Sequence, residues 1–179
     1  MPGTSALQEL EIAIDLCFRE RLITPTLALL YSGIDTMAWL GLPDKREDVT
    51  RNDFTRWADH YLLPDSGLAC TSLDLYSSRC GIVHSMTAES STIRRGDAKR
   101  IFFAWGNRGA EDLQRIADRI GHAGCAVHVD TLIKAFQTAV NRFMKASELD
   151  SDLGRRVSIR LGRVLTKLQI PGEWKLNLS

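Results

Sequence analysis

Two side chains that could take part in a reaction lie close together near the middle of the chain. Arg79 and His84 are five positions apart in Asp74-Leu-Tyr-Ser-Ser-Arg-Cys-Gly-Ile-Val-His-Ser-Met86, a run compatible with a helix. An arginine stays positively charged and donates several hydrogen bonds, whereas a histidine gains and loses a proton near neutral pH. Together the two side chains could stabilise a phosphate and transfer a proton, so they are the first candidates for a reactive site.

The spacing of this pair leaves two geometries open. Successive helical residues are rotated by about 100°, so positions five apart differ by about 140° around the axis. The flexible stem of Arg79 could fold towards His84 on the same helix. Alternatively, two copies of the helix could face each other, so that side chains from both chains converge. The spacing favours the second geometry, a composite site at the interface of a symmetric homodimer.

The segment Arg79-Cys-Gly-Ile-Val-His84 resembles the arginine-to-histidine signature of HEPN (higher eukaryotes and prokaryotes nucleotide-binding) domains. These domains are helical bundles that carry the signature on a late helix. The resemblance covers the arrangement of about residues 5–90 and the closing helices, and its specific part is two residues. It implies a metal-independent endoribonuclease that acts on single-stranded RNA as a dimer and needs no cofactor. Arg79 would stabilise charge on the scissile phosphate, and His84 would be the general acid or base.

Two positions differ from the family pattern, and three residues are auxiliary candidates. Cys80 follows the arginine where a polar residue is frequent, and Met86 stands where a toxin branch has tyrosine, which argues against a tyrosine-modified toxin. Asp35 is the one carboxylate in an otherwise apolar helix, and an unpaired buried charge is costly. We therefore expect Asp35 either to be a hydrogen-bonded structural residue or to lie near the site. Cys80 and Ser85 flank the pair and complete the auxiliary set.

Two other interpretations use the same residues differently. A non-catalytic HEPN-like module would bind RNA, a nucleotide, or a protein partner such as an antitoxin or a regulator. A structural scaffold would instead pair Arg79 with Asp74 or Glu89 and keep His84 as a hydrogen-bonded core residue.

Apolar periodicity predicts the elements that must position these residues. The first helix is expected at residues 5–20, and the second at about 24–40 with Thr24 as its cap and Pro25 at its first position. Thr50 and Asp53 predict the start of a third helix that ends before Pro64. A fourth helix, at about 68–86, carries Arg79 and His84, and a polar loop follows at 87–96.

The second half of the chain predicts a small β insertion and two closing helices. Short strands are expected at 100–105 and 125–129 around a helix at 110–121, then helices at about 130–146 and 151–168 and a coil tail at 170–179. The predicted fold class is mainly α, an antiparallel helical bundle with a small two-stranded β insertion at about 98–129. Residues 1–179 are expected to form a single domain.

Charge is distributed unevenly along the sequence. Residues 1–90 contain 7 Lys and Arg against 13 Asp and Glu, whereas residues 91–179 contain 16 against 9. A basic second half suits an anionic partner. The RNA-binding candidates precede three aromatic residues and are Arg94, Arg95, Lys99 and Arg100. A second basic stripe, on the last helix, could follow a nucleic-acid backbone or be a solvated face; it comprises Arg155, Arg156, Arg160, Arg163 and Lys167.

Several other classes of protein lack support in the sequence. The chain contains no GxxxxGK[ST], GxGxxG, HExxH or GxSxG motif. His122, Cys125 and His128 offer three metal ligands without a fourth, and strand alternation would separate the last two, so no metal site is predicted. The N-terminus lacks the pattern of a signal peptide, and the longest apolar run, 22–34, is too short to span a membrane. A cytoplasmic protein without membrane contact is expected.

Overall fold

A computed structural model of the 179-residue chain describes residues 6–87 and 90–164. The helical elements are α1 (Ala6–Arg19), α2 (Ile23–Leu40), α3 (Arg51–Trp57), the π-helical turn η1 (Ala58–Leu62), α4 (Ser72–Ser85), α5 (Ser91–Arg94), α6 (Ala110–Arg119), α7 (Val129–Leu149) and α8 (Ser151–Leu161). The strands are β1 (Ile101–Ala104) and β2 (Cys125–His128). The predicted class, mainly α with a small two-stranded insertion, is confirmed.

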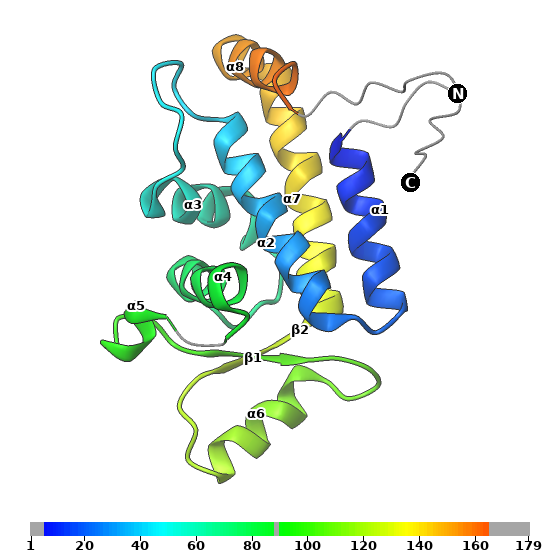
Figure 1. The fold of residues 1–179 in the computed structure, drawn as a ribbon, viewed down its shortest axis with the longest axis vertical. Coiled ribbons are helices and arrows are strands. Elements are labelled where there is room, and N and C mark those ends of the chain that lie inside the picture. The colour runs from blue at the N-terminus through cyan, green and yellow to red at the C-terminus, as the bar shows by residue number, and fades with distance from the viewer. Residues whose placement is uncertain (1–5, 88–89, 165–179) are drawn as a thin grey trace, which may run out of the picture.

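Helices α1, α2 and α7 lie side by side and form the long part of the molecule (Figure 1). Helix α1 runs antiparallel to α2, and α8 crosses the upper end of α7. Helices α3 and α4 lie on the other flank of α2, which is apolar nearly all round and central, as its sequence predicts. Its buried residues include Leu30, Tyr31 and Ile34, which have no exposed surface. Burial of this kind is the main source of stability in such a bundle.

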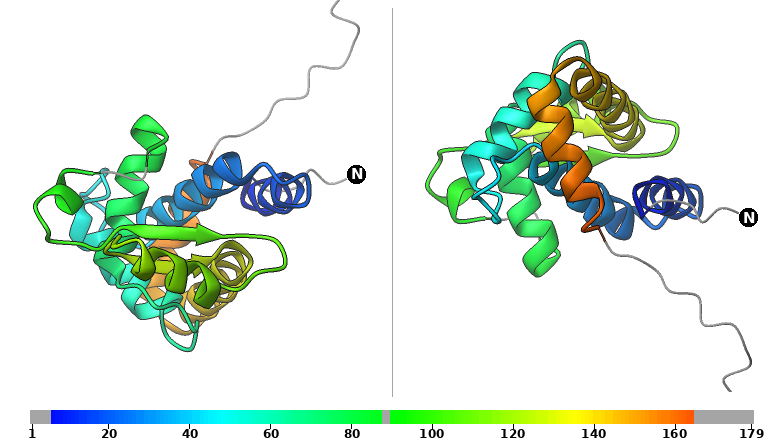
Figure 2. Two further views of the ribbon diagram at one scale, coloured as in Figure 1. Left: turned by 90° about the horizontal axis from the view of Figure 1, so that it is seen from below. Right: turned by 90° about the horizontal axis from the view of Figure 1, so that it is seen from above.

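Strands β1 and β2 lie between the helical bundle and α6 (Figures 1 and 2). They are parallel and in register, with Ile101 opposite Cys125 and Ala104 opposite His128. Parallel neighbours need a crossover connection, and α6 supplies it. Ile101 and Val127 belong to the same buried cluster as the bundle residues. The insertion thus packs directly under the helices instead of standing apart from them.

Three predicted helix boundaries were wrong. The second helix begins at Ile23 after Leu22, so Pro25 lies in the first turn without Thr24 as cap. The fourth helix begins at Ser72, four residues later than predicted, because Thr71 provides a side-chain cap. The last helix ends at Leu161. The remainder of its predicted extent, 165–168, and the predicted coil tail lie outside the described residues.

The segment predicted as a polar loop at 87–96 contains the short helix α5. Ser90 caps it, since its hydroxyl accepts a hydrogen bond from the Ile93 backbone N–H at 3.4 Å. Apolar periodicity could not reveal a helix of one turn, because a single turn contains too few positions to show a pattern. Among residues 6–87 and 90–164, no helix combines the length and the apolar character that crossing a membrane requires.

Candidate functional site

Helix α4 is fixed at its N-terminus by a reciprocal pair of hydrogen bonds. Asp74 accepts from the Thr71 backbone N–H at 2.9 Å, and the Thr71 hydroxyl accepts from the Asp74 backbone N–H at 3.2 Å. The second oxygen of Asp74 accepts from the Lys99 backbone N–H at 2.6 Å, which links the helix to the start of β1. Asp74 is therefore a structural cap, and it is not the partner of Arg79. Glu89, the other predicted partner, lies outside the described residues.

Arg79 instead pairs with Asp35 of α2. The arginine donates from Nε to Asp35 Oδ2 at 2.7 Å, and its Nη2 lies 2.6 Å from the same oxygen. Both side chains are about one-fifth exposed, at 22% and 21%. Charge-assisted bonds of this kind fix the plane of the guanidinium group. The sequence offered two alternatives for Asp35, a structural hydrogen bond or a place near the site. Asp35 has both, because its hydrogen-bond partner is Arg79.

Asp35 and Arg79 form a constellation with a third residue, His84, which lies on the exposed last turn of α4. Its Nε2 lies 3.2 Å from Arg79 Nη1 within the same chain. The arginine stem therefore bridges the angular offset between positions 79 and 84, which is the first of the two geometries that the sequence left open. A guanidinium group only donates hydrogen bonds, so Nε2 is the acceptor in this contact. The scaffold interpretation placed His84 in the core, whereas the residue is exposed.

The electrostatics of Asp35 reflect two opposed influences. Partial burial raises the pKa of the Asp35 carboxyl above its ordinary value, although the charge and hydrogen bonds of Arg79 and the neighbouring His84 act in the opposite direction. Burial has the larger influence, because a charge removed from water loses its hydration. For Arg79, the nearby carboxylate outweighs burial and raises the pKa of the guanidinium further. Arg79 is thus a permanent cation whose position is set by a partly buried carboxylate.

A surface groove of about 690 Å³ lies next to this constellation, between α3, α4 and α5. Two of the auxiliary candidates, Cys80 and Ser85, line it. The Ser85 hydroxyl donates to the Gly81 carbonyl at 3.0 Å and lies 3.0 Å from the Thr87 hydroxyl. The remaining lining residues are Arg51, Tyr76, Ser90, Ser91, Thr92, Arg94 and Arg95. Hydroxyl and guanidinium groups therefore dominate the groove.

The structure separates the four predicted RNA-binding residues into two sets. Arg94 and Arg95 line the groove, whereas Lys99 and Arg100 are not among its lining residues. Arg95 forms an exposed ion pair with Asp97 at 2.9 Å. Arg94, in contrast, makes no ion pair within residues 6–87 and 90–164. Its charge is available to an external anion.

Arg51 is a groove residue that the sequence did not single out. It is the first residue of α3, and no carboxylate pairs with it in the described part of the chain. Its position directly after the predicted cap Thr50 placed it at the end of a helix, but nothing local indicated that this end faces α4 and α5. That proximity results from packing between elements far apart in the sequence.

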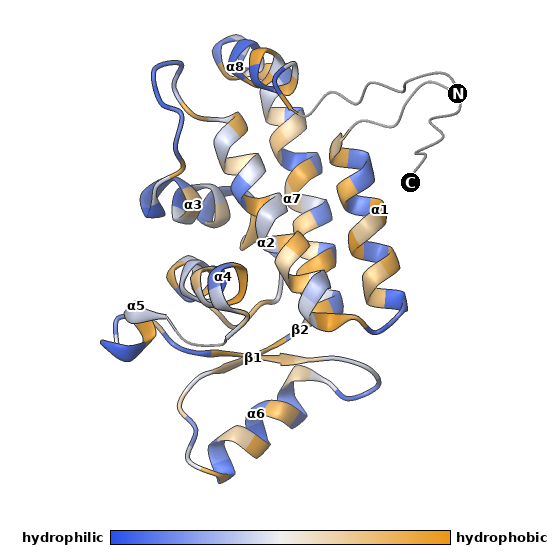
Figure 3. Cartoon of the chain, in the orientation of Figure 1, coloured by the Kyte–Doolittle hydropathy of each residue, from blue (hydrophilic) through white to orange (hydrophobic). Residues whose placement is uncertain are grey.

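The basic stripe on α8 has a different environment. Arg155 pairs with Asp44 at 2.7 Å, and Arg163 pairs with Glu47 at 2.8 Å. Both acids belong to the hydrophilic loop between α2 and α3, which is blue in Figure 3. Arg160 is buried and donates to the carbonyls of Pro43 and Arg46 at 3.0 and 2.7 Å. These arginines hold the loop against α8. Lys167 lies outside the described residues.

The histidine and cysteine residues around β2 also have structural positions. His128 caps α7, since its Nδ1 accepts from the Asp130 backbone N–H at 3.3 Å, and its Nε2 lies 3.2 Å from the Gly106 carbonyl oxygen. His122 contacts Phe102 edge to face, with ring centroids 6.5 Å apart. Within the described ranges, 6–87 and 90–164, no three His, Cys, Asp or Glu side chains are grouped as a metal site would require.

No protein-family model, no curated protein and no solved structure matches this chain. The chemistry of Asp35, Arg79 and His84, and of the groove beside them, is therefore the only basis for assigning a function to the described residues.

Proposed function

We propose that the protein is an HEPN-like, metal-independent endoribonuclease that cleaves single-stranded RNA. The observation that carries this proposal is the contact at 3.2 Å between Arg79 and His84, made on an exposed helix end while Asp35 holds the other edge of the guanidinium. A fixed cation beside an exposed imidazole is the pair of groups that phosphodiester transfer without a metal requires.

In this proposal Arg79 stabilises the transition state. The 2′-hydroxyl of the RNA attacks the adjacent phosphorus, and charge accumulates on the non-bridging oxygens before the bond to the 5′-oxygen breaks. Asp35 occupies Nε–H and one Nη2–H of Arg79. The N–H groups of Nη1 remain directed at the space that His84 shares, where a phosphate oxygen would replace the imidazole as acceptor. A donor aimed at the developing charge typically contributes on the order of 10²–10³ in rate.

His84 performs the proton transfer in this proposal. Its unprotonated Nε2 is the atom that faces Arg79, so entry of a phosphate would free that nitrogen to take the proton of the 2′-hydroxyl. The leaving 5′-oxygen needs a proton in return, and a second copy of the chain would supply a second histidine for it. The products would be a 2′,3′-cyclic phosphate and a 5′-hydroxyl.

The groove supports an anionic polymer as the ligand. Arg51 and Arg94 form no ion pair with any residue that the structure describes, and three hydroxyl residues of α5 and its cap, Ser90, Ser91 and Thr92, also line the groove. Contacts with phosphates position a nucleic acid without reading its sequence. The groove is therefore the path along which we place the strand that enters the Arg79 site.

The end of α4 supports pairing of two chains. Helix α4 extends beyond its neighbours in both views of Figure 2. Val83 and Met86, on either side of His84, are 37% and 77% exposed, so the end of α4 offers apolar surface to a partner. A homodimer that covers Val83 and Met86 would bring two copies of His84 together. Light scattering should then give about twice the 20.0 kDa mass of one chain at working concentration. The variant Met86→Lys should give the mass of a single chain.

The proposal is tested with purified protein and mixed single-stranded RNA in excess EDTA. We expect fragments with 2′,3′-cyclic phosphate ends, and we expect His84→Ala to slow their formation by roughly 10²–10⁴. His122→Ala is the matched control, because His122 is exposed and lies between α6 and β2, away from helix α4 in the sequence, and it should cleave like the wild type.

Each contrary outcome has a distinct meaning. Equal cleavage by wild type and His84→Ala, or cleavage only when a metal is added, would refute the proposed chemistry. If no RNA is cleaved but a mobility shift occurs at low salt and disappears in Arg51→Gln with Arg94→Gln, the protein is the non-catalytic binding module instead.

A further inference from the structure

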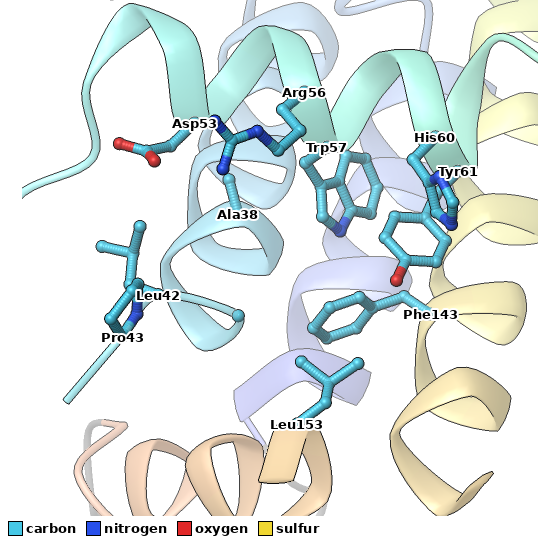
Figure 4. Close-up of a pocket in the computed structure, with 11 residues that line it drawn as sticks. Ala38, Leu42, Pro43, Asp53, Arg56, Trp57, His60, Tyr61, Phe143 and Leu153 are labelled. Carbon is cyan, nitrogen blue, oxygen red and sulfur yellow. The ribbon is translucent and has the colours of Figure 1, made fainter. Parts of the chain in front are cut away.

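A second cavity, of about 310 Å³, lies between α2, α3, η1, α7 and α8. Trp57, Tyr61 and Phe143 form an aromatic wall, and aliphatic side chains close the other sides: Ala38, Leu42 and Leu153 (Figure 4). The three rings contact each other, with centroids 5.7, 6.3 and 5.2 Å apart. A cavity of roughly 150 Å³ is sufficient to hold benzene in an apolar protein interior. The present cavity therefore accommodates one ring with a short substituent.

The aromatic wall is shaped by a turn of π-helix. The Leu63 backbone N–H donates to the Ala58 carbonyl at 2.9 Å, a bond that spans five residues instead of four. A wider turn is less stable than regular α-helix, and such turns occur frequently at functional sites. Here it lies directly after Trp57 and contains both His60 and Tyr61. The wider turn thus forms the part of the helix that borders the cavity.

Trp57, which lines this cavity, carries a buried hydrogen-bond donor that is not used. The residue is 5% exposed, and its indole nitrogen has no acceptor among the described protein groups. Figure 4 shows this nitrogen on the edge of the ring that is turned towards Phe143 and Leu153. A buried donor without an acceptor is destabilising, because it has lost its hydrogen bond to water. An acceptor atom carried by a ligand would remove that cost.

The rim of the cavity carries positive charge. Arg56 and His60 line it and are exposed, and Figure 4 shows the Arg56 guanidinium reaching over the side formed by Ala38. Asp53 is the one acid in the lining, and its carboxylate accepts from Arg46 and Thr50, so it does not neutralise Arg56. Arg56 forms no ion pair within residues 6–87 and 90–164. The rim therefore favours an anionic group.

We propose that this cavity binds a small planar aromatic carboxylate. The ring lies against Trp57, Tyr61 and Phe143, one carboxylate oxygen accepts from the Trp57 indole N–H, and Arg56 pairs with the charge at the rim. The site is separate from Arg79 and His84 and does not depend on whether the protein cleaves RNA.

Benzoate is the probe, and the indole N–H signals of ¹⁵N-labelled protein are the readout. The chain has four tryptophans, and loss of one signal in Trp57→Phe assigns Trp57; if that variant does not fold, replacing each of the other three in turn assigns it by elimination. We expect benzoate to shift the Trp57 signal saturably while the other three signals stay in place. Cyclohexanecarboxylate lacks the planar aromatic ring and benzyl alcohol lacks the charge, so both should bind more weakly than benzoate.

Arg56→Gln and Arg51→Gln form a matched pair for the charge at the rim. Both arginines are exposed on the same helix, but only Arg56 borders the cavity. Arg56→Gln should weaken benzoate binding about threefold, as expected for a partly exposed ion pair, and Arg51→Gln should leave it unchanged. Absence of a saturable shift up to the solubility limit of benzoate would overturn the proposal, as would equal weakening by the two variants or tighter binding of benzyl alcohol.

Discussion

Two aspartates of this protein each hold an arginine, yet their surroundings differ. Asp53 is 8% exposed and accepts from Arg46, at 2.9 Å to Oδ1, and from the Thr50 backbone N–H, also at 2.9 Å, as well as from the Thr50 hydroxyl. Although burial opposes it, these donors lower the pKa of Asp53 to about 2. Asp35 receives hydrogen bonds from Arg79 through a single oxygen, and burial raises its pKa.

The difference separates an ion pair that stabilises the fold from one that positions a cation. Asp53 accepts hydrogen bonds from donors at the start of α3 and in the loop before it, so both of its carboxylate oxygens are engaged in local structure. Asp35 joins α2 to α4, and the guanidinium that it holds continues to an exposed histidine. A partly desolvated carboxylate with a single partner adds little stability but defines where that partner points.

The largest expected effect comes from replacing the two arginines by lysine. Arg79→Lys should reduce RNA cleavage at least about 100-fold, because an ammonium group cannot bond Asp35 and a phosphate in one plane. Arg46→Lys should leave the rate of the folded enzyme unchanged and lower its melting temperature. Single-turnover cleavage and thermal unfolding of both variants measure this difference. Similar rates for the two variants would remove the distinction between the pairs.

A second prediction concerns the pH dependence of stability. The folded-state pKa of Asp53, about 2, lies below the ordinary value of 3.8 for an aspartate. Its contribution is therefore present above about pH 4 and is lost as the pH falls towards 2. We expect the free energy of unfolding of wild type to exceed that of Asp53→Asn by about 1 kcal/mol at pH 6, a modest figure because solvent screens the half-exposed Arg46. The two should converge near pH 2 in urea titrations, and a constant difference would refute the assignment.

The smallest effect is expected on the α8 stripe. Arg163 pairs with Glu47 on the surface and lies over the Trp39 ring, 5.5 Å from its centroid. Exposed ion pairs contribute little, so Arg163→Gln should shift the melting temperature by about 2 °C or less. RNA binding should be unaffected, because this arginine already has an internal partner. A mobility shift weakened as strongly as in Arg94→Gln would show that the stripe, and not the groove, binds the anion.

Local signals in the sequence predicted much of the fold. The central, nearly all-apolar α2, the Thr50 cap with Asp53, and the helix between two short strands each appear within a few residues of sequence. The start of α4 was misplaced because Leu68 continued the apolar pattern, while the Thr71 cap with Asp74 decided the boundary. Short-range pattern indicated the type of the longer elements, and at α4 the cap determined where the helix begins.

The site was predictable only in part, because its geometry depends on distant contacts. Arg79, His84 and the isolated carboxylate Asp35 were recognisable as unusual residue types, but the 44-residue separation between Asp35 and Arg79 hid their pairing. The angular offset between positions 79 and 84 favoured a site shared by two chains. The arginine stem is long enough for Arg79 to reach His84 within one chain. Arg51 and the cavity beside Trp57 left no local signal, since both arise where separate helices meet.

The most direct test of the distinction between the two pairs compares Asp35→Asn with Asp53→Asn in two measurements on each protein, the cleavage rate at saturating RNA and the free energy of unfolding. We expect Asp35→Asn to slow cleavage about tenfold or more, because Arg79 loses its fixed orientation, with little change in stability. Asp53→Asn should lower stability and leave cleavage by the folded protein intact. If Asp35→Asn unfolds the protein as readily as Asp53→Asn and cleaves at the wild-type rate once folded, the Asp35 and Arg79 pair is structural, and the proposed site is wrong.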